Sequence, residues 1–412
     1  MINKNYISMS KGWFITITGH ALFFIYLFFI NYFSDDLVYS EFRYWFNAAA
    51  ICSQLLIFAT DIFLLKTVRF DNLQIKLPKH LISIWLGITC FCLICIVITA
   101  YQSKYTQTAL VLMSWLWALS NILVAFYKIY STPTAAFFHS NITLRVVRLI
   151  SFLPLGLLFF TSLALINMEN LIIITIISQL VFCFLMSLTI IKWLRNLNII
   201  FIAYPTFLKS VVATFMTTAV GLLMLRVDVL LVYIFGVTQN YKFFDYAFII
   251  IAICHTSSQI LLRNAEAKVV NKEVVDRNIV LSDFLNYAYV SSGLVVVFMF
   301  VAKEWSFNQQ GQHIISVILA GYLFYFSFGP LLELRNLKSS SLKPFGLFVI
   351  ATAISYFVAV NLNLMPELRC AYSIAMSFVF FRILHCIVIE KITDYHVYFK
   401  RLPLIFLIGI IS

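Results

Sequence analysis

The stretch Leu81–Tyr101, LISIWLGITCFCLICIVITAY, decides the class of fold. It contains no Asp, Glu, Lys or Arg. An α-helix needs about 20 predominantly apolar residues to cross the hydrocarbon core of a bilayer, which is about 30 Å thick. The stretch is therefore long enough and apolar enough to span a membrane as a single helix.

The composition of the whole chain agrees with this reading. The 412 residues are 62% hydrophobic and 11% charged, and the mean hydropathy is +0.95. Soluble domains carry about 25% charged residues and need a more polar surface than this chain can supply. The net charge of +12 does not indicate nucleic-acid binding, because that requires basic residues clustered on one accessible face. We therefore expect an all-α polytopic membrane protein with membrane lipids, and no nucleic acid, around it.

Read outward from this stretch, the chain contains twelve candidate transmembrane helices. The connections between them are short and polar, and none is long enough to fold as a domain. Lys4 and Lys11 precede the first stretch, which lacks a small-residue cleavage motif and is expected to be a retained helix rather than a signal peptide. The apolar tail Leu402–Ile411 is too short to span and is expected at the interface. The twelve stretches are residues 12–33, 45–65, 81–101, 108–128, 146–166, 171–191, 210–235, 241–262, 283–302, 314–334, 345–363 and 370–389.

The distribution of Lys and Arg predicts the orientation of these helices. Cytoplasmic loops of membrane proteins carry an excess of Lys and Arg. With the N-terminus inside, 22 of the 29 basic residues fall on inner segments. Five fall on outer loops and two within spans, and this bias predicts that both termini are cytoplasmic. The outer five are Arg43, Lys104, Lys242, Lys303 and Arg369, and the two within spans are Arg226 and Arg382.

The eight cysteines indicate neither a disulfide framework nor a metal site. Most of them lie in apolar runs, where a cysteine behaves as a small buried hydrophobe. Cys90, Cys92 and Cys95 are closely spaced, but on a helix this spacing spreads them around the axis, and no His or carboxylate accompanies them. We expect no bound metal.

An internal repeat relates the two halves of the chain. YSEFRYWFNAAAIC (39–52) and YKFFDYAFIIIAIC (241–254) agree at seven of fourteen positions, with an offset of 202 residues. The same offset maps the first six spans onto the last six in order. Because six is an even number, the halves share one topology and are expected to be parallel repeats related by an axis along the membrane normal. The expected domains are a six-helix lobe over residues 1–195, a second over residues 196–401, and a short tail over residues 402–412.

The segment RVDVLLVYIFGVTQNYKFFDYAFIIIA (226–252) resembles the start of the second lobe of Wzx-type polysaccharide flippases. These belong to the multidrug/oligosaccharidyl-lipid/polysaccharide exporter superfamily. Members have an Asp in the outer part of span 7, then an apolar run, a short loop and an aromatic-rich start of span 8. This chain departs from many members in having Asn240, not Gly, before the loop-exit Tyr241, and in having only 12 glycines. Helix number, repeat and length extend the resemblance over nearly the whole chain.

The resemblance implies a transporter rather than an enzyme. Such a flippase moves an undecaprenyl-pyrophosphate-linked oligosaccharide from the cytoplasmic to the periplasmic face of the bacterial inner membrane by alternating access. The repeat unit then enters O-antigen of lipopolysaccharide or another surface polysaccharide. The partners implied are a polysaccharide polymerase and a chain-length regulator. No cofactor is implied, and protons, sodium or a downstream pull are the alternative driving forces.

Arg226 and Asp228 are the first candidates for a site, because charged groups in the bilayer are costly and usually functional. Both lie in the outer half of span 7. On one continuous helix, residues two apart do not face each other, so at least one is expected to look into a cleft between the lobes. Arg226 would bind pyrophosphate or an acidic sugar, and Asp228 would carry a coupling ion. The alternative is structural pairing, for instance with Asp245.

Three further ionisable groups are candidates at the cytoplasmic half. His20 and His255 lie on spans 1 and 8, which line the central cavity of the resembled family, and each could meet an anion or titrate. The alternative for each is a satisfied packing residue. Asp61, near the inner end of span 2, is either a coupling residue or the partner of Lys66.

The remaining candidates are Arg382 on span 12 and the pair Asn47 and Gln54 on span 2. Arg382 either faces the cavity or extends to the headgroups. Asn47 and Gln54 are seven residues apart and could present one polar stripe to the cleft or make interhelical hydrogen bonds. Tyr241 at the outer mouth is read as an interface anchor or a platform for a sugar ring.

Three other classes of protein are alternatives to a flippase. A multidrug or cation exporter of the same superfamily predicts an acidic cavity, whereas the intramembrane residues here lean basic. A membrane polysaccharide polymerase or glycosyltransferase needs a large extramembrane region, which the short outer loops do not provide. A major-facilitator carrier has a glycine-containing basic loop between spans 2 and 3, and the loop here, KTVRFDNLQIKLPK (66–79), has no glycine.

Overall fold

The computed structural model of the protein is mostly helical and divides into two compact units, Met1–Ala219 and Val220–Ser412. Each unit is described by itself, as the N-terminal unit and the C-terminal unit. The residues that the structure describes are 27, 30–32, 34–61, 64, 70–71, 74–130, 167–194, 198–202, 207–224, 226–254, 290, 293–297, 309–327, 343–385 and 387–388.

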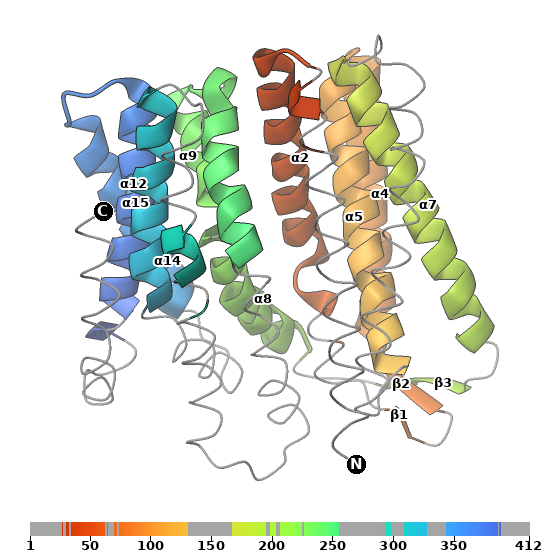
Figure 1. Ribbon diagram of the computed structural model, residues 1–412. Helices are drawn as coiled ribbons and strands as arrows, with labels where there is room; N and C mark the ends of the chain where they lie inside the picture. The colour runs from red at the N-terminus through yellow and green to blue at the C-terminus, as the bar shows by residue number, and fades with distance from the viewer. Residues whose placement is uncertain are drawn as a thin grey trace, which may run out of the picture. The chain divides into compact units, whose positions relative to one another are not determined.

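The N-terminal unit is a set of helices gathered around α5 (Figure 1). Helix α5 packs against three others, α2, α4 and α7. Between α2 and α5, the rings of Phe46 and Trp117 lie edge to face with centroids 4.8 Å apart. The Trp45 indole N–H donates to the carbonyl of Thr106 at 3.2 Å. The helices are α2 (Asp36–Ile57), α4 (Lys79–Tyr101), α5 (Tyr105–Tyr130) and α7 (Met168–Leu194).

A small sheet joins two connections of the N-terminal unit. Its strands are β1 (Phe70–Asp71), β2 (Gln74–Pro78) and β3 (Asn198–Ile202). Strand β1 pairs antiparallel with β2, and β2 pairs parallel with β3, with Gln74 opposite Asn198 and Pro78 opposite Ile202. The sequence predicts both segments as loops, because each strand is short and the partner of β2 lies far away in the chain.

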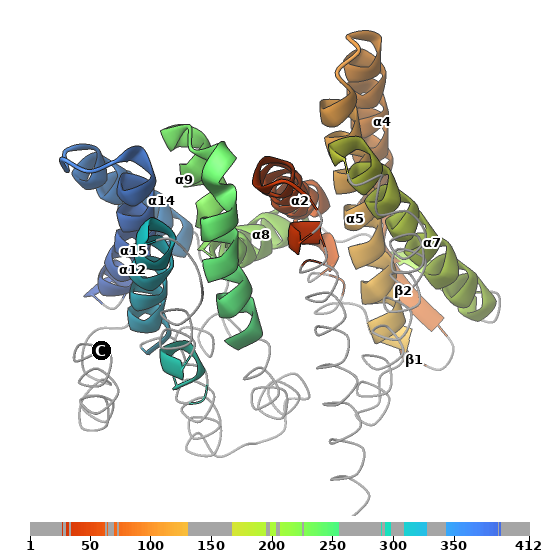
Figure 2. The same cartoon turned by 45° about the horizontal axis from the view of Figure 1, so that its top comes forward.

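The C-terminal unit contains α9 (Val227–Phe235), the 3-10 turn η2 (Thr238–Asn240) and the helix over residues 241–254. These are followed by α12 (Gln309–Ser327), α14 (Lys343–Val360) and α15 (Pro366–His385). Helix α15 packs against α9, α12 and α14, and Figures 1 and 2 show α12, α14 and α15 side by side. Helix α8 (Phe207–Met224) contains the division between the units.

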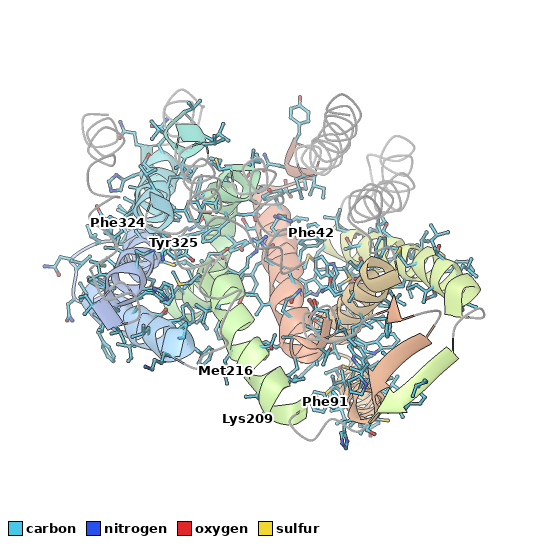
Figure 3. The ribbon with its side chains drawn as sticks, turned by 90° about the horizontal axis from the view of Figure 1, so that it is seen from below. Phe42, Phe91, Lys209, Met216, Phe324 and Tyr325 are labelled. Carbon is cyan, nitrogen blue, oxygen red and sulfur yellow. The ribbon has the colours of Figure 1, made fainter. Side chains whose placement is uncertain are left out.

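Five of the described helices are long and apolar enough to cross a membrane. They match the predicted spans over residues 81–101, 108–128, 171–191, 345–363 and 370–389 to within a few residues. Helix α4 exposes its apolar side chains on several sides, with Leu86 61%, Phe91 60% and Val97 67% exposed. Figure 3 labels Phe91 among them. A surface this apolar is expected to contact lipid. The five are His80–Tyr101, Tyr105–Phe126, Met168–Ile191, Lys343–Val360 and Pro366–His385.

Two predicted spans differ from the helices of the structure in their bounds or continuity. The span over residues 45–65 begins already at Asp36 and ends at Ile57, because Phe58 and Ala59 adopt left-handed φ values of 50° and 52°. The span over residues 210–235 is broken into α8 and α9. The predicted spans over residues 12–33 and 146–166 lie mostly or wholly outside the described residues, so the count of twelve helices stays a prediction.

The described helices also occupy equivalent places in the repeat. With the 202-residue offset, α12 corresponds to part of α5, and α15 overlaps the counterpart of α7. In the N-terminal unit α5 packs against α7, and in the C-terminal unit α12 packs against α15. One helix pairing is thus common to both units, and the repeat and the arrangement as two lobes stay predictions.

Gly321 permits the close approach of α12 and α15. A Cβ atom added at Gly321 would lie 2.6 Å from the Cα atom of Ala375, which is closer than non-bonded carbon atoms approach in proteins. We predict that Gly321→Ala lowers stability in detergent by roughly 1–3 kcal/mol, because overpacking separates the helices. A shift in the thermal unfolding midpoint measures this.

The matched control is Gly346→Ala on α14, where an added Cβ meets no atom within 4 Å. This variant should melt at or above the wild-type temperature, because alanine is a better helix former than glycine. Equal midpoints for both variants would show that α12 and α15 do not pack at Gly321.

Candidate functional site

A helix break places Arg226 and Asp228 in the C-terminal unit. Helix α8 ends at Met224 and α9 begins at Val227. Between them, Arg226 has φ −139° and ψ 25°, outside the helical region. Arg226 therefore precedes the first turn of α9. It does not lie within one continuous helix formed by α8 and α9. The expectation that Arg226 and Asp228 cannot approach each other assumed a continuous helix, and this assumption was wrong.

Asp228 is completely buried in the first turn of α9. The hydroxyl of Tyr241 donates a hydrogen bond to its Oδ2 atom. Its Oδ1 atom has no hydrogen-bond partner in the described part of the chain. The positive end of a helix dipole favours a carboxylate in the first turn, so the break in the span also creates an environment that stabilises Asp228.

Arg226 and Asp245 complete this group of charges. Both lie close enough to Asp228 to act on it electrostatically, Arg226 by attraction and Asp245 by repulsion. Arg226 is half-buried, and Asp245 is fully buried. We call Arg226, Asp228, Tyr241 and Asp245 the Asp228 cluster. Tyr241 is also fully buried, so in this structure it supports Asp228 and is not available to stack on a sugar.

The beginning of α15 closes the same end of the C-terminal unit. The side-chain amide of Asn240 donates to Glu367 Oε1 at 2.8 Å. Cys370 is fully buried and lies within electrostatic range of both Asp228 and Glu367. The loop between α9 and the helix over residues 241–254 is thus bound to α15 by a polar contact beside the cluster.

Arg382 forms a second buried site in the C-terminal unit. Its side chain is 1% exposed, and its Nε–H donates to the carbonyl of Tyr325 at 3.0 Å. The guanidinium carbon lies 4.7 Å from the centroid of the Tyr325 ring, which Figure 3 labels on α12. Nη1 and Nη2 have no partner among the described residues. Arg382 is therefore held inside the helix bundle, which disfavours the alternative that it extends to lipid headgroups.

The N-terminal unit contains a buried cation at a position where the sequence predicts an outer loop. Arg43 lies in α2 and is 2% exposed, with its guanidinium carbon 5.2 Å from the centroid of the Phe46 ring. Asn47 follows one turn later and is fully buried, whereas Gln54 is half-buried. The predicted polar stripe on α2 therefore includes Arg43. Asp35 and Asp36, which are typical of a helix start, were the signal that could have placed Arg43 inside the helix.

Asp61 follows the turn that ends α2. The Thr60 hydroxyl donates to the carbonyl of Ile57 at 2.7 Å, and Asp61 itself is half-buried. The predicted partner Lys66 lies outside the described residues, and so do His20 and His255. The roles predicted for both histidines stay predictions.

The repeat places opposite charges at one equivalent position. With the offset of 202 residues, Arg43 corresponds to Asp245, and both are buried. Of the predicted candidates, Arg226 lies within electrostatic range of Asp228, whereas Asn47 and Gln54 lie on α2 of the N-terminal unit. Arg382 stands in a separate site. Within the described ranges no group of three or more His, Cys, Asp or Glu residues could hold a metal ion.

Comparisons with protein-family models, with curated proteins and with solved structures found no match to this chain.

The hydrogen bond from Tyr241 to Asp228 is testable by a double-mutant cycle. We predict that Tyr241→Phe lowers the free energy of unfolding by about 1–3 kcal/mol, because it removes the donor from a buried carboxylate. Asp228→Asn should also destabilise. The double variant should be less destabilised than the sum of the single variants, because the two residues share one interaction. Thermal unfolding of the purified proteins measures all three. Additive effects would show that the hydroxyl and the carboxylate are not coupled.

Proposed function

We propose that this chain is a transporter that moves an undecaprenyl-pyrophosphate-linked oligosaccharide across the bacterial inner membrane. The observation that carries the proposal is the presence of guanidinium groups buried among apolar helices. Arg43 and Arg382 are each almost fully buried, and Arg226 stands at a helix break. A buried ion has an effective desolvation penalty of several kcal/mol, so such groups are retained where they perform a task.

A pyrophosphate-linked substrate would explain why the buried cations are arginines. Arginine presents a planar set of N–H donors that fits phosphate oxygens in a bidentate arrangement. The two Nη groups of Arg382 have no partner among the described side chains and carbonyls. The polar head of the substrate would cross past such cations while its polyprenyl tail stays in lipid. The resemblance of residues 226–252 to polysaccharide flippases supports the same substrate class.

The mechanism proposed is alternating access of two lobes around a cavity. The chain would release the repeat unit to the periplasm for O-antigen or another surface polysaccharide, beside a polymerase and a chain-length regulator. Asp228 and Asp245, both completely buried, are the carboxylates that would bind a coupling proton or sodium ion. His20, His255, Asp61, Asn47 and Gln54 remain candidates for the cavity.

A cation exporter of the same superfamily is the second candidate. The observation that favours it is the pair of fully buried carboxylates in the Asp228 cluster, because an acidic site suits a cationic cargo. A polymerase is less well supported. The connections that the structure describes are short, with residues 102–104 alone joining α4 to α5 and residues 361–365 joining α14 to α15.

The arginines are tested in vesicles that contain a fluorescent undecaprenyl-pyrophosphate-linked sugar. We predict that Arg226→Ala, Arg43→Gln and Arg382→Gln each slow flipping by roughly ten-fold or more, because a hydrogen bond to a charged group contributes about 1.5–3 kcal/mol. In cells, Arg226→Ala should abolish surface glycan assembly while the protein level in the membrane stays unchanged. Loss of a labelled headgroup to an external quencher measures the rate of flipping.

The control for these variants is Lys104→Ala, because Lys104 is exposed in the connection between α4 and α5. It should flip the lipid at the wild-type rate. Full activity of all three arginine variants would refute the flippase proposal. If Asp228→Asn and Asp245→Asn instead abolished the efflux of an organic cation, and no lipid moved, the exporter would be the correct function.

The orientation is tested with a reporter enzyme inserted between residues 263 and 280. We predict a cytoplasmic signal, because the basic residues of this loop follow the positive-inside rule. An insertion between residues 102 and 104 should report the periplasm and is the matched control. A periplasmic signal from the first insertion would overturn both the helix count and the cytoplasmic placement of the termini.

A further inference from the structure

One residue of α12 holds the buried guanidinium of Arg382 in place. The Nε–H group donates to the carbonyl of Tyr325 at 3.0 Å, and the guanidinium carbon lies 4.7 Å from the centroid of the Tyr325 ring. These two contacts use one nitrogen and one face of the guanidinium. The end formed by Nη1 and Nη2 has no hydrogen-bond partner in the described part of the chain, although the side chain is only 1% exposed.

Aromatic side chains pack beside the ring that carries this guanidinium. The Tyr325 ring contacts the rings of Phe378 and Phe381, with centroid distances of 5.6 and 6.2 Å, and both phenylalanines are fully buried. Phe381 in turn contacts Phe348 of α14 at 6.5 Å. Such rings solvate a charge poorly, so a guanidinium without a counterion has a large desolvation penalty here.

The carboxylates that the structure describes in the C-terminal unit lie toward the opposite end of α15. They are Asp228, Asp245 and Glu367. Glu367 precedes Arg382 by fifteen residues of helix, which is about 22 Å at 1.5 Å per residue. Cys370, which lies within electrostatic range of Asp228, precedes Arg382 by about 18 Å on the same scale. Asp245 lies in the same group as Asp228, so all three are too far away to form an ion pair with Arg382.

Two further features favour a negative charge near Arg382. His385 is fully buried and lies on the same face of α15, because residues three apart on a helix are neighbours. Its imidazole ring has an N–H group that can donate. Helix α14 begins at Lys343, so its positive N-terminal end lies within about 8 Å, along its axis, of the contact between Phe348 and Phe381.

The alternative is that Arg382 serves only the C-terminal end of its own helix. Arg382 and His385 are the basic residues of the last turn of α15, where cations complement the negative end of the helix dipole. A dipole attracts the charge of the guanidinium but does not provide acceptors for Nη1 and Nη2, which have none among the described residues. These two donor groups are therefore the observation that favours a bound anion.

We propose that Arg382 binds one monovalent inorganic anion, chloride, inside the C-terminal unit. The Nη1 and Nη2 groups donate to the anion, while Nε keeps its hydrogen bond to Tyr325. A single negative charge neutralises the guanidinium, whereas a doubly charged phosphate would leave a net charge among apolar rings. A monatomic ion also needs the least space beside a side chain that is almost fully buried.

This inference goes beyond the proposed function, because the anion is bound whatever the chain transports. Exchange of chloride for the pyrophosphate of a substrate would need water and further cations around Arg382, and hence another conformation of the chain. A chain that binds chloride at Arg382 but flips no lipid would refute the flippase proposal alone.

The purified wild-type chain provides the first test, by equilibrium dialysis against radioactive chloride. We expect one chloride per chain, displaced by bromide and not by gluconate, which is too large for a buried site. Anomalous scattering from crystals grown in bromide should place the ion within hydrogen-bonding distance of Nη1 and Nη2. Absence of bound chloride, or bromide found only elsewhere, would overturn the proposal. Displacement of chloride by an equal concentration of inorganic phosphate would overturn the choice of a monovalent anion.

Variants provide the second test, with the same dialysis. We expect Arg382→Gln to bind chloride roughly ten-fold or more weakly, because it loses the charge and both N–H donors. The matched control is Arg369→Gln, which removes the same charge from the other end of α15, where Arg369 is half-buried. The control should bind chloride as the wild type does, and equal binding by the two variants would overturn the proposal.

Thermal unfolding in detergent provides the third test. Chloride should raise the unfolding midpoint of the wild-type chain above its value in gluconate at the same ionic strength, because a ligand that binds only the folded state stabilises it. The rise should saturate with chloride concentration and be absent in Arg382→Gln. An equal rise in this variant would contradict the proposal. If Arg382→Gln does not fold, the dialysis and the scattering of the wild-type chain decide, because they need no substitution.

Discussion

The structure depends on one constraint, which is that no water is present in a hydrocarbon layer to satisfy a buried polar group. Each such group must find its partners inside the protein. Asp228 receives a hydrogen bond from Tyr241 and the attraction of Arg226. Arg382 donates to a backbone carbonyl of α12 and lies over the ring of the same residue, Tyr325. These contacts satisfy only part of each group, because Oδ1 of Asp228 and both Nη atoms of Arg382 have no hydrogen-bond partner among the described residues.

The same constraint links the break between α8 and α9 to the carboxylate beside it. Interrupting a helix leaves backbone N–H groups at the start of the next helix without intrahelical acceptors. At α9 these groups lie at the positive end of the helix dipole, and Asp228 is in that first turn. The positive end of the helix dipole at the break therefore favours the charged carboxylate of Asp228.

Sequence patterns predicted the five apolar helices well, because length and hydropathy alone define them. They failed where a contact, near or distant in the sequence, determines the conformation of the backbone. Arg43 was placed outside the helix because a hydropathy window excludes a charged residue, although it packs over Phe46 inside α2. The sheet was missed because β2 and β3 gain their hydrogen bonds only from each other. Sequence patterns identified Arg226 and Asp228. They did not predict the relative positions of the two residues, which depend on the helix break.

Strand β3 and the first half of α8 belong to the N-terminal unit because of their strand pairing and side-chain packing, not because of their composition. The predicted boundary at residue 195 rests on the internal repeat, which divides the predicted spans into two sets of six. In the structure β3 extends the sheet of the N-terminal unit, and Val211 of α8 packs in one cluster with Leu64, Leu77 and Leu81. Phe215 of the same helix stacks on Phe58 at 4.4 Å. The compact unit therefore continues to Ala219, because these contacts fasten the first half of α8 to the helices that precede it.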